Sequence, residues 1–251
     1  MSSFQQTLTQ LRDLRLISMA DALARQMEQP RLHDLGFEER LSLLVDFEWT
    51  ERQSRKLKRL ISSAGLPEAA NLEALDFRAA RGLDKSQVAS LGSCDWIRRQ
   101  QNLIILGATG AGKTWLACAF ANQACRSKFV AKFYKASDLF SDINLAMLDG
   151  SLPKLKLALS KPSLLLIDDL GVGEMTAGIA HVLLDIVDRR MRTGALLITS
   201  QYPPEQWHSM FPDPTVADAI LDRIVHQAHR VNLKGESMRR TLARSRMKQD
   251  R

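Results

Sequence analysis

The sequence has few cysteines and no long hydrophobic run. Its 251 residues include three cysteines, Cys94, Cys118 and Cys125, whose spacing matches no metal-ligand or disulfide pattern. We therefore expect small buried thiols in a reducing compartment. No apolar stretch reaches the length that crosses a bilayer, and the first residues, MSSFQQTLTQ, do not resemble a signal peptide. These absences favour a cytoplasmic location with no membrane association.

The chain also has no internal repeat and no low-complexity segment. Hydrophobic residues make up 45% and charged residues 25%, which is the balance of a globular chain with one large or two modest domains. Lysine and arginine number 35 against 28 acidic residues, so the formal net charge is +7. This excess favours a polyanionic partner, but it does not distinguish DNA from RNA or a membrane surface.

Residues 1–80 predict a small, all-helical N-terminal domain for partner binding or oligomerisation. The stretch LSLLVDFEWTERQSRKLKRLI begins with apolar residues at helical spacing and then turns basic. Gly65 and Pro67 follow it and are expected to end the helix. Four basic residues share one face of this helix, which is either an ordinary solvated face or a nucleic-acid contact: Arg52, Arg55, Lys56 and Arg59.

Residues 81–251 predict a second domain of the α/β class, with a helical hinge at 81–101. From residue 102 onward, strand-like runs alternate with helical patterns. This alternation indicates a parallel sheet that helices cover on both faces. Five strands are expected, at residues 102–106, 128–134, 163–167, 195–200 and 230–233.

A glycine loop follows the first expected strand. The stretch GATGAGKT matches the phosphate-binding pattern G-x-x-x-x-G-K-[ST], although a chance glycine turn before a helix is the alternative. Glycines let such a loop curl so that backbone N–H groups point at phosphate oxygens. Lys113 is predicted to reach the β- and γ-phosphates of the nucleotide, and the Thr114 hydroxyl to bind Mg²⁺. The nucleotide-binding loop is expected to comprise Gly107, Ala108, Thr109, Gly110, Ala111, Gly112, Lys113 and Thr114.

An acid pair ends the third expected strand, in SLLLIDDLG. Ligands of open parallel sheets bind at the carboxyl ends of the strands, so we expect Asp168 to hold Mg²⁺. Asp169 is the predicted general base that polarises the attacking water. Most such ATPases have glutamate at the second position, and Glu174 is an alternative base. Two acids that merely cap a turn are the other interpretation.

The fourth expected strand, in ALLITSQYP, ends in polar residues. In this architecture, a polar residue at that point contacts the γ-phosphate or the lytic water. Gln201 is the first candidate, followed by Thr199 and Ser200. Polar residues also end many strands without any catalytic role.

One expected strand separates the glycine loop from the strand of the acid pair, as in additional-strand ATPases. With these motifs the chain resembles AAA+ ATPases, and within them the IstB-like transposition helpers of bacterial insertion sequences, which are related to DnaC helicase loaders. The resemblance spans nearly the whole chain and implies a P-loop AAA+ domain that binds ATP and Mg²⁺. The stretches most specific to the family are FEERLSLLVDFEWTERQ, DWIRRQQNLIILGATGAGKT, TSQYPPEQWH, DPTVADAILDRIVHQAHRV and LKGESMR.

The resemblance assigns roles to two later arginines. Arg223, in ADAILDRIVH, is where helicase-loader relatives carry an arginine finger that reaches the ATP of the neighbouring subunit. Arg239, in GESMRR, is at the position of the second sensor, which would contact the nucleotide. Too few residues follow Arg239 for a complete helical lid. A surface arginine is the alternative in each case.

Between the second and third expected strands there is room for two helices, with a break near Gly150 and Pro153. Initiator-type AAA+ proteins have an extra helix there, which lets subunits stack as an open spiral on DNA. No base-reading residues are evident, so we expect binding to double-stranded DNA to be largely independent of sequence. Besides the basic face at 52–59, the candidate backbone contacts are Lys154, Lys156, Lys161 and the tail at 239–251.

The resemblance thus implies an ATP-dependent helper that oligomerises on target DNA and recruits or activates a partner transposase. ATP would lie between subunits, with turnover stimulated by DNA. A DnaC-like replicative helicase loader is the alternative, and residues 1–80 of such a loader would bind a helicase. A third possibility is a nucleotide-binding switch without useful turnover, which the aspartate at position 169 permits.

Overall fold

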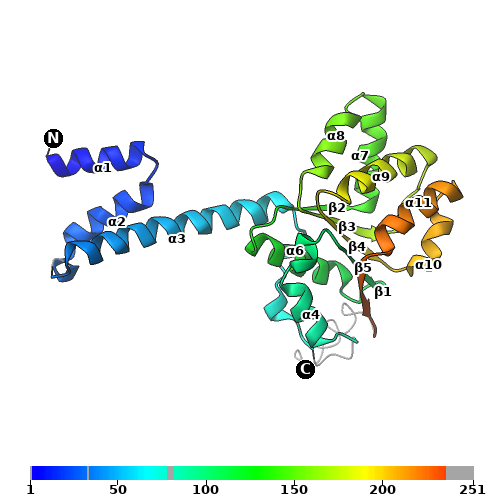
Figure 1. Cartoon of the computed structure of the whole chain (residues 1–251), viewed down its shortest axis with the longest axis horizontal. Coiled ribbons are helices and arrows are strands. Elements are labelled where there is room, and N and C mark those ends of the chain that lie inside the picture. Colours follow the sequence, from blue (N-terminus) through cyan, green and yellow to red (C-terminus); the bar gives the residue numbers. More distant parts are fainter. Residues whose placement is uncertain (1, 33, 78–81, 236–251) are drawn as a thin grey trace, which may run out of the picture. The chain divides into compact units, whose positions relative to one another are not determined.

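The computed structural model of the chain describes residues 2–32, 34–77 and 82–235 (Figure 1). By the compactness of its contacts the chain divides into two units, Met1–Arg59 and Leu60–Arg251. The boundary between these units precedes the domain boundary expected near residue 80. The expected boundary stays a prediction.

The first unit contains α1 (Ser3–Asp13), α2 (Ile17–Glu28), the short 3-10 helix η1 (Pro30–Leu32) and most of α3 (Phe37–Ala64). Its buried apolar side chains among the described residues are few and include Leu8, Ala20 and Leu44. Glu48 of α3 is also buried, and it accepts hydrogen bonds from the backbone of Met19 at 2.9 Å and from Arg52 at 2.6 Å. The unit therefore rests on a small core together with a buried polar cluster.

Helix α3 ends at Ala64, and Gly65 follows with φ +66°, in the left-handed region that favours glycine. The predicted end of this helix is confirmed. Beyond it, η2 (Leu72–Ala74), α4 (Lys85–Gly92) and α5 (Asp95–Arg98) lead to the sheet. This segment belongs to the second unit and packs on α6, where Asn122 donates a hydrogen bond to the carbonyl of Ala70 at 2.7 Å.

The second unit is built on a five-stranded sheet in the order β2-β3-β4-β1-β5, and every described strand pair is parallel. The predicted five-stranded parallel sheet of an α/β fold is confirmed. The second strand begins later than expected, because Lys128 adopts φ +69° and its amide donates to the carbonyl of Cys125 in a turn. The strands are β1 (Asn102–Gly107), β2 (Ala131–Lys135), β3 (Leu164–Leu170), β4 (Ala195–Ser200) and β5 (Ala228–Leu233).

Helices cover the sheet on both faces, with α6 on one side and α7, α9 and α11 on the other (Figure 1). The central strands are nearly free of solvent contact, because residues such as Leu103, Ile104 and Leu166 are fully buried. Among the described residues, no helix has the length and apolar character needed to cross a membrane. The helices of this unit after β1 are α6 (Lys113–Arg126), α7 (Ala136–Leu148), α8 (Leu152–Ser160), α9 (Ala177–Arg190), α10 (Pro204–Trp207), η3 (His208–Met210) and α11 (Pro214–Val225).

The three cysteines are buried free thiols, as predicted. Burial raises the pKa of Cys118 to about 11, so this thiol stays protonated near neutral pH. The cysteines therefore serve as small core residues.

Candidate nucleotide-binding site

The candidate site lies at the carboxyl edge of the sheet, where β1, β3 and β4 end. The glycine loop connects the last residue of β1, Gly107, to the first residue of α6, Lys113. Asp168 and Asp169 lie near the end of β3, and Thr199 lies near the end of β4. The fold thus brings residues from three separate parts of the sequence to one edge, as expected for a parallel sheet.

The loop needs glycine at two points for different reasons. Gly107 has φ +156°, and a Cβ there would lie 2.7 Å from the backbone oxygen of Leu233 in the neighbouring strand β5. Gly112 precedes α6 with φ +94°, a conformation that a side chain would strain. These two residues let the chain pass close to β5 and then turn into the helix, whose N-terminal N–H groups form an anion-binding end.

Lys113 is the first residue of α6 and is only 5% exposed. Its Nζ donates a hydrogen bond to the carbonyl of Ala108, at 3.2 Å, within the same loop. Burial lowers the pKa of Lys113, and the negative charges of Asp169 and Asp168 oppose that shift. A buried cation beside two acids and inside a glycine loop is suited to hold the phosphates of a nucleotide.

Thr114, Asp168 and Thr199 form a compact cluster of oxygen atoms. The Thr114 hydroxyl donates to the Asp168 carboxylate, with distances of 2.9 and 3.1 Å to its two oxygens. The Thr199 hydroxyl donates to the same carboxylate at 2.6 Å. Burial raises the pKa of Asp168, and the negative charge of Asp169 acts in the same direction. The hydrogen bonds from Thr199 and Thr114 and the positive charge of Lys113 oppose this shift.

The chemistry of this donor set fits Mg²⁺, which prefers hard oxygen ligands and commonly binds through one or two carboxylates and the phosphates of its substrate. Thr114 and Asp168 are close enough together to share one such ion. In the described part of the chain there is no group of three or more histidine, cysteine or acidic side chains that could hold a metal without a substrate.

Asp169 lies in a β-bulge of β3. The pairing of β3 with β4 runs from Ile167 opposite Ile198 to Leu170 opposite Ser200, so two residues of β3 face Thr199 alone. Asp169 has φ +56°, and its backbone N–H donates to the Thr199 hydroxyl at 2.9 Å. The negative charges of Asp168 and Asp169 both act to raise the pKa of Lys113.

The polar residues at the end of β4 have different contacts. Gln201 is exposed and lies next to the glycine loop, where the Thr109 hydroxyl donates to its Oε1 at 2.9 Å. Ser200 is buried and donates to the carbonyl of Leu170 at 2.6 Å, so it supports the bulge. The structure thus brings Gln201 to the loop and Thr199 to the acid pair. Glu174 is exposed in the segment after β3.

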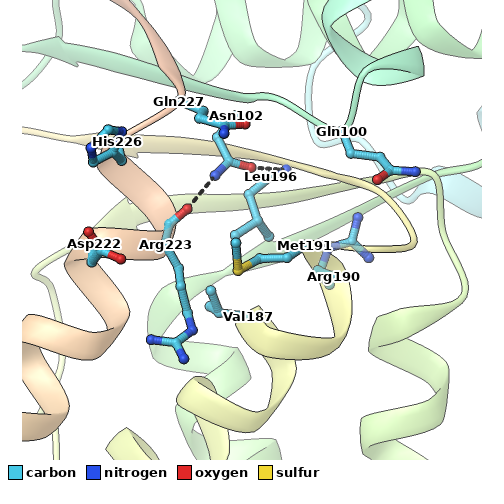
Figure 2. Close-up of a pocket in the computed structure, with 10 residues that line it drawn as sticks. All are labelled: Gln100, Asn102, Val187, Arg190, Met191, Leu196, Asp222, Arg223, His226 and Gln227. Carbon is cyan, nitrogen blue, oxygen red and sulfur yellow. Dashed lines mark hydrogen bonds between the residues drawn. The ribbon is translucent and has the colours of Figure 1, made fainter.

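Arg223 lies at the other edge of the sheet. Asn102, the first residue of β1, donates hydrogen bonds to the carbonyls of Arg223 at 3.2 Å and Ile224 at 3.0 Å (Figure 2). Its Oδ1 accepts from the backbone of Leu196 at 3.0 Å, which ties α11 to the starts of β1 and β4. Because the glycine loop is at the far end of β1, Arg223 is not brought to the loop of its own chain.

The Arg223 side chain extends away from Asn102 along a cavity of about 270 Å³ (Figure 2). Its Nε donates to the carboxylate of Asp188 near the end of α9, and its Nη1 donates to the carbonyl of Ala219 at 2.7 Å. The side chain of Arg223 is 30% exposed. The guanidinium is therefore held from one side and remains accessible.

The other predicted arginine, Arg239, and the basic tail at 239–251 lie outside the described residues. Two of the basic residues on α3, Arg52 and Arg55, form ion pairs with the buried Glu48. Lys156 on α8 pairs with Asp185 on α9. The other candidate DNA contacts in the described part of the chain, Lys56, Arg59, Lys154 and Lys161, are exposed.

Asp188, the ion-pair partner of Arg223, is a site residue that the sequence patterns do not indicate. Nothing in the segment LLDIVDRRM distinguishes Asp188 from Asp185, which also lies on α9. Thr199, a candidate placed behind Gln201, bonds the Asp168 carboxylate and the Asp169 backbone. Both contacts join elements that are distant in the sequence.

Comparisons with known proteins agree on one family. The protein-family model described as "IstB-like ATP binding protein" matches residues 9–246. A protein of Sinorhizobium fredii named as an insertion sequence ATP-binding protein, y4pL, is 39% identical over 238 residues, which cover 95% of this chain and 97% of the relative. A Pseudomonas fluorescens protein named as an ATP-binding protein of the insertion sequence IS1162 is 42% identical over 200 residues, covering 79% of this chain and 87% of the relative.

Two solved structures share the fold. A crystal structure of DnaI has a TM-score of 0.54 and 19% sequence identity, and the match covers 70% of this chain and 94% of that one. AMPPCP-bound DnaA from Aquifex aeolicus has a TM-score of 0.56 and 17% identity, with 74% of this chain and 56% of that chain covered. At this level of identity the similarity shows the fold alone.

Proposed function

The chain belongs to the family of IstB-like ATP-binding proteins, and from that membership we propose that it is a transposition helper powered by ATP hydrolysis. In this proposal it assembles on target DNA in the cytoplasm and recruits or activates a partner transposase. The observation that carries the ATP-dependent step is the cluster of Lys113, Thr114, Asp168 and Thr199 at the glycine loop.

The loop N–H groups and Lys113 would bind the phosphates of ATP, and Thr114 and Asp168 would hold Mg²⁺. When bound, Mg²⁺ neutralises charge on the β- and γ-phosphates. Asp169 would accept a proton from the attacking water, and its electrostatic effect on Lys113 in the glycine loop supports this role. Gln201 would orient that water or contact the γ-phosphate from its position beside Thr109.

Arg223 would act on the ATP of a neighbouring subunit. The carbonyl of Arg223 is bound to Asn102 at the start of β1, whereas the loop follows Gly107 at the end of that strand. The five residue steps between these positions span about 17 Å, which is longer than an arginine side chain. An Arg223 that stabilises the transition state must therefore reach a different chain, so the proposed ATPase is an oligomer with ATP at its interfaces.

The DNA-binding part of the proposal rests on the net charge of +7 and on the exposed basic residues of α3 and α8. Contacts from such residues to phosphates depend little on base sequence and weaken with salt. The names of the relatives, which refer to insertion sequences, favour a transposase as the protein partner. Binding to a replicative helicase instead of a transposase would support the helicase-loader alternative.

The first test is ATP hydrolysis with and without random-sequence duplex DNA. We expect DNA to stimulate turnover, and both Lys113→Ala and Arg223→Ala to abolish the stimulated rate. Mixing the two inactive variants should restore turnover, because one subunit supplies an intact loop and the other an intact arginine. Arg126→Ala, which removes an ion pair with Glu73, is the matched control and should behave as wild type.

Three results would each contradict a part of this proposal. Turnover that the mixture of Lys113→Ala and Arg223→Ala does not restore would argue against action between subunits. ATP binding with no turnover under any condition would leave the nucleotide-dependent switch as the function. A Lys113→Ala variant that assembles on duplex DNA with ATP as wild type does would separate assembly from ATP binding.

A further inference from the structure

A buried arginine, Arg190, lies where α8, α9 and β4 meet. It is the last residue of α9 and is only 1% exposed. Its Nη1 donates to the carbonyl of Leu159, near the end of α8, at 2.8 Å. Its Nη2 donates to the carbonyl of Ala195, the first residue of β4, at 2.6 Å. One guanidinium therefore holds three segments of the chain together.

This cation is buried without an acidic partner in the part of the chain that the structure describes. Burial lowers the pKa of Arg190 to about 10, so the guanidinium stays charged near neutral pH. Its Nε has no hydrogen-bond partner among the described residues. Burial of a charge is costly, and the two carbonyls that Arg190 binds are what offset that cost here.

The loops that follow α8 and α9 also pass close to each other. A Cβ at Gly194 would lie 2.6 Å from the backbone oxygen of Ser163 and 2.8 Å from Nη2 of Arg190. The Thr193 hydroxyl donates to the carbonyl of Ser160 at 3.4 Å. A junction packed this closely leaves the end of α8 little freedom to move relative to α9 and β4.

Two short paths connect this junction to Arg223. Asp188, two residues before Arg190 on α9, accepts a hydrogen bond from the Arg223 side chain. In β4, the backbone N–H of Leu196 donates to Asn102, which in turn donates to the Arg223 carbonyl. Arg190 and Arg223 also line the same cavity (Figure 2). Both the backbone and the side chain of Arg223 thus depend on the position of the junction.

The junction also holds a helix that carries candidate DNA contacts. Lys154 on α8 and Lys161 directly after α8 are exposed, and α8 packs beside α9 (Figure 1). Lys156 pairs with Asp185 of α9, and Asp185 is 54% exposed, so this ion pair is weak and a DNA phosphate can replace the acid. The buried bonds of Arg190 would keep α8 on α9 when DNA draws Lys156 away.

We propose that Arg190 is a positioning residue that joins α8 to Arg223, so that DNA bound to α8 sets the approach of Arg223 to the ATP of the neighbouring subunit. This inference rests on the proposed function, which takes α8 as a DNA contact and Arg223 as an arginine finger. Arg190 itself touches neither DNA nor ATP, because it is buried within its own chain. The path through Arg190 lets DNA on one helix raise turnover at a site made by two subunits.

Turnover of the full chain at saturating ATP, measured against the concentration of random-sequence duplex DNA, tests the inference. Arg190→Met fills most of the same space, removes both hydrogen bonds and leaves no charge buried. A misplacement of about 1 Å can cost about 100-fold in rate, so we expect the maximal DNA-stimulated rate to fall about tenfold. The KM for ATP and the DNA concentration at half-stimulation should stay within about twofold of wild type, because Arg190 contacts neither ligand.

Two other variants serve for comparison. Asp185→Asn removes the exposed ion pair between the same two helices, and DNA should stimulate it as it does wild type. Lys154→Ala removes a candidate DNA contact, so it should raise the DNA concentration at half-stimulation, which Arg190→Met should not. ATP binding by each variant shows that the second unit is folded. Arg190→Lys, whose single ammonium cannot reproduce the fork of the guanidinium, replaces Arg190→Met if the latter does not bind ATP.

Mixed subunits show on which side of the interface the defect lies. Addition of Lys113→Ala subunits to Arg190→Met should restore turnover, because they bring an intact Arg190 and Arg223 to an intact glycine loop. Addition of Arg223→Ala subunits should not restore it, because both variants are then defective on the same surface. A general defect of folding would not distinguish the two mixtures.

Three results would overturn the inference and leave the proposed function in place. If DNA stimulates Arg190→Met as it does wild type, Arg190 is not on the path. If Lys113→Ala subunits do not restore turnover, Arg190 is a structural residue of its own chain. If only the DNA concentration at half-stimulation changes, Arg190 supports DNA binding at α8 alone. In contrast, normal DNA stimulation of Arg223→Ala would contradict the proposed function itself, and this inference with it.

Discussion

The hydroxyl of Thr199 lies 2.6 Å from a carboxylate oxygen of Asp168, to which it donates a hydrogen bond. The same hydroxyl oxygen accepts a bond from the backbone N–H of Asp169 at 2.9 Å. One side chain at the end of β4 therefore holds both the Asp168 carboxylate and the backbone of Asp169 at the end of β3. Because Thr199 is fully buried, water cannot replace these bonds.

Replacement of Thr199 by valine keeps the shape of the side chain but removes the hydroxyl. The Asp169 N–H and an Asp168 oxygen then lose a partner, at a cost of about 1–3 kcal/mol. We expect Thr199→Val to lower the turnover number for ATP about tenfold, which is the effect of a rise of about 1.4 kcal/mol in the barrier. Thr199→Ser keeps the hydroxyl and should remain near wild type. Equal rates for wild type and Thr199→Val would show that the bond does not matter for turnover.

The ion pair between Asp188 and Arg223 predicts a positioning role for Asp188, if Arg223 is the arginine finger. Both side chains are partly exposed, so the pair is worth no more than about 1 kcal/mol. Asp188→Asn should lower the turnover number by up to about fivefold and leave the KM for ATP unchanged. Asp185→Asn is the matched control, because Asp185 is on the same helix but pairs with Lys156.

Mixed subunits separate positioning from a general structural defect in Asp188→Asn. Addition of Lys113→Ala subunits should restore turnover, because these subunits carry an intact Arg223–Asp188 pair to an intact glycine loop. If mixing does not restore turnover, or if Asp188→Asn raises the KM for ATP, then Asp188 acts within its own chain.

Gly107→Ala should damage both stability and nucleotide binding. The added Cβ would lie 2.7 Å from the backbone oxygen of Leu233, so β5 or the loop must move. Overpacking of this kind costs about 1–3 kcal/mol, and thermal unfolding should show a lower Tm. Gly36→Ala is the control, because no heavy atom lies within 4 Å of a Cβ at Gly36. An unchanged Tm together with normal ATP affinity in Gly107→Ala would contradict the tight approach of the loop to β5.

The buried Asp168 predicts a pH-dependent stability without metal or nucleotide. Burial raises its pKa in the folded chain, so between the unfolded and folded pKa values the folded chain binds more protons. This contribution is therefore present at low pH and is lost as pH rises through that window. Asp168→Asn lacks the buried charge, so its Tm relative to wild type should be higher at pH 7 than at pH 4, measured with EDTA. It should also lose turnover, and an identical Tm difference at both pH values would contradict the argument.

The strands and the glycine loop could be predicted because their signals are local. A run such as Leu164–Ile167 is hydrophobic at every position, which indicates a strand buried on both faces. The glycine pattern around Gly107 and Gly112 needs only its own few residues. In contrast, the bond from Thr199 to Asp168 joins residues 31 positions apart, and it depends on which strands are neighbours.

The pairing of Asp188 with Arg223 could not be predicted for the same reason. It depends on α9 and α11 packing side by side, which no local motif records. Likewise, only the structure shows that Leu44 on α3 is buried while its neighbour Val45 is exposed. Motif recognition thus finds the groups that carry chemistry, and the fold supplies the residues that hold them.

The bulge in β3 affects whether a related protein keeps the arrangement of this site. Asp168 and Asp169 of β3 lie opposite a single residue of β4, Thr199. The placement of the two acids along the strand therefore depends on the extra residue in β3, and not on the identity of the acids alone. A relative that keeps both aspartates but lacks the extra residue would retain the motif in an alignment and lose the arrangement in space. Conservation of strand length is as informative here as conservation of side chains.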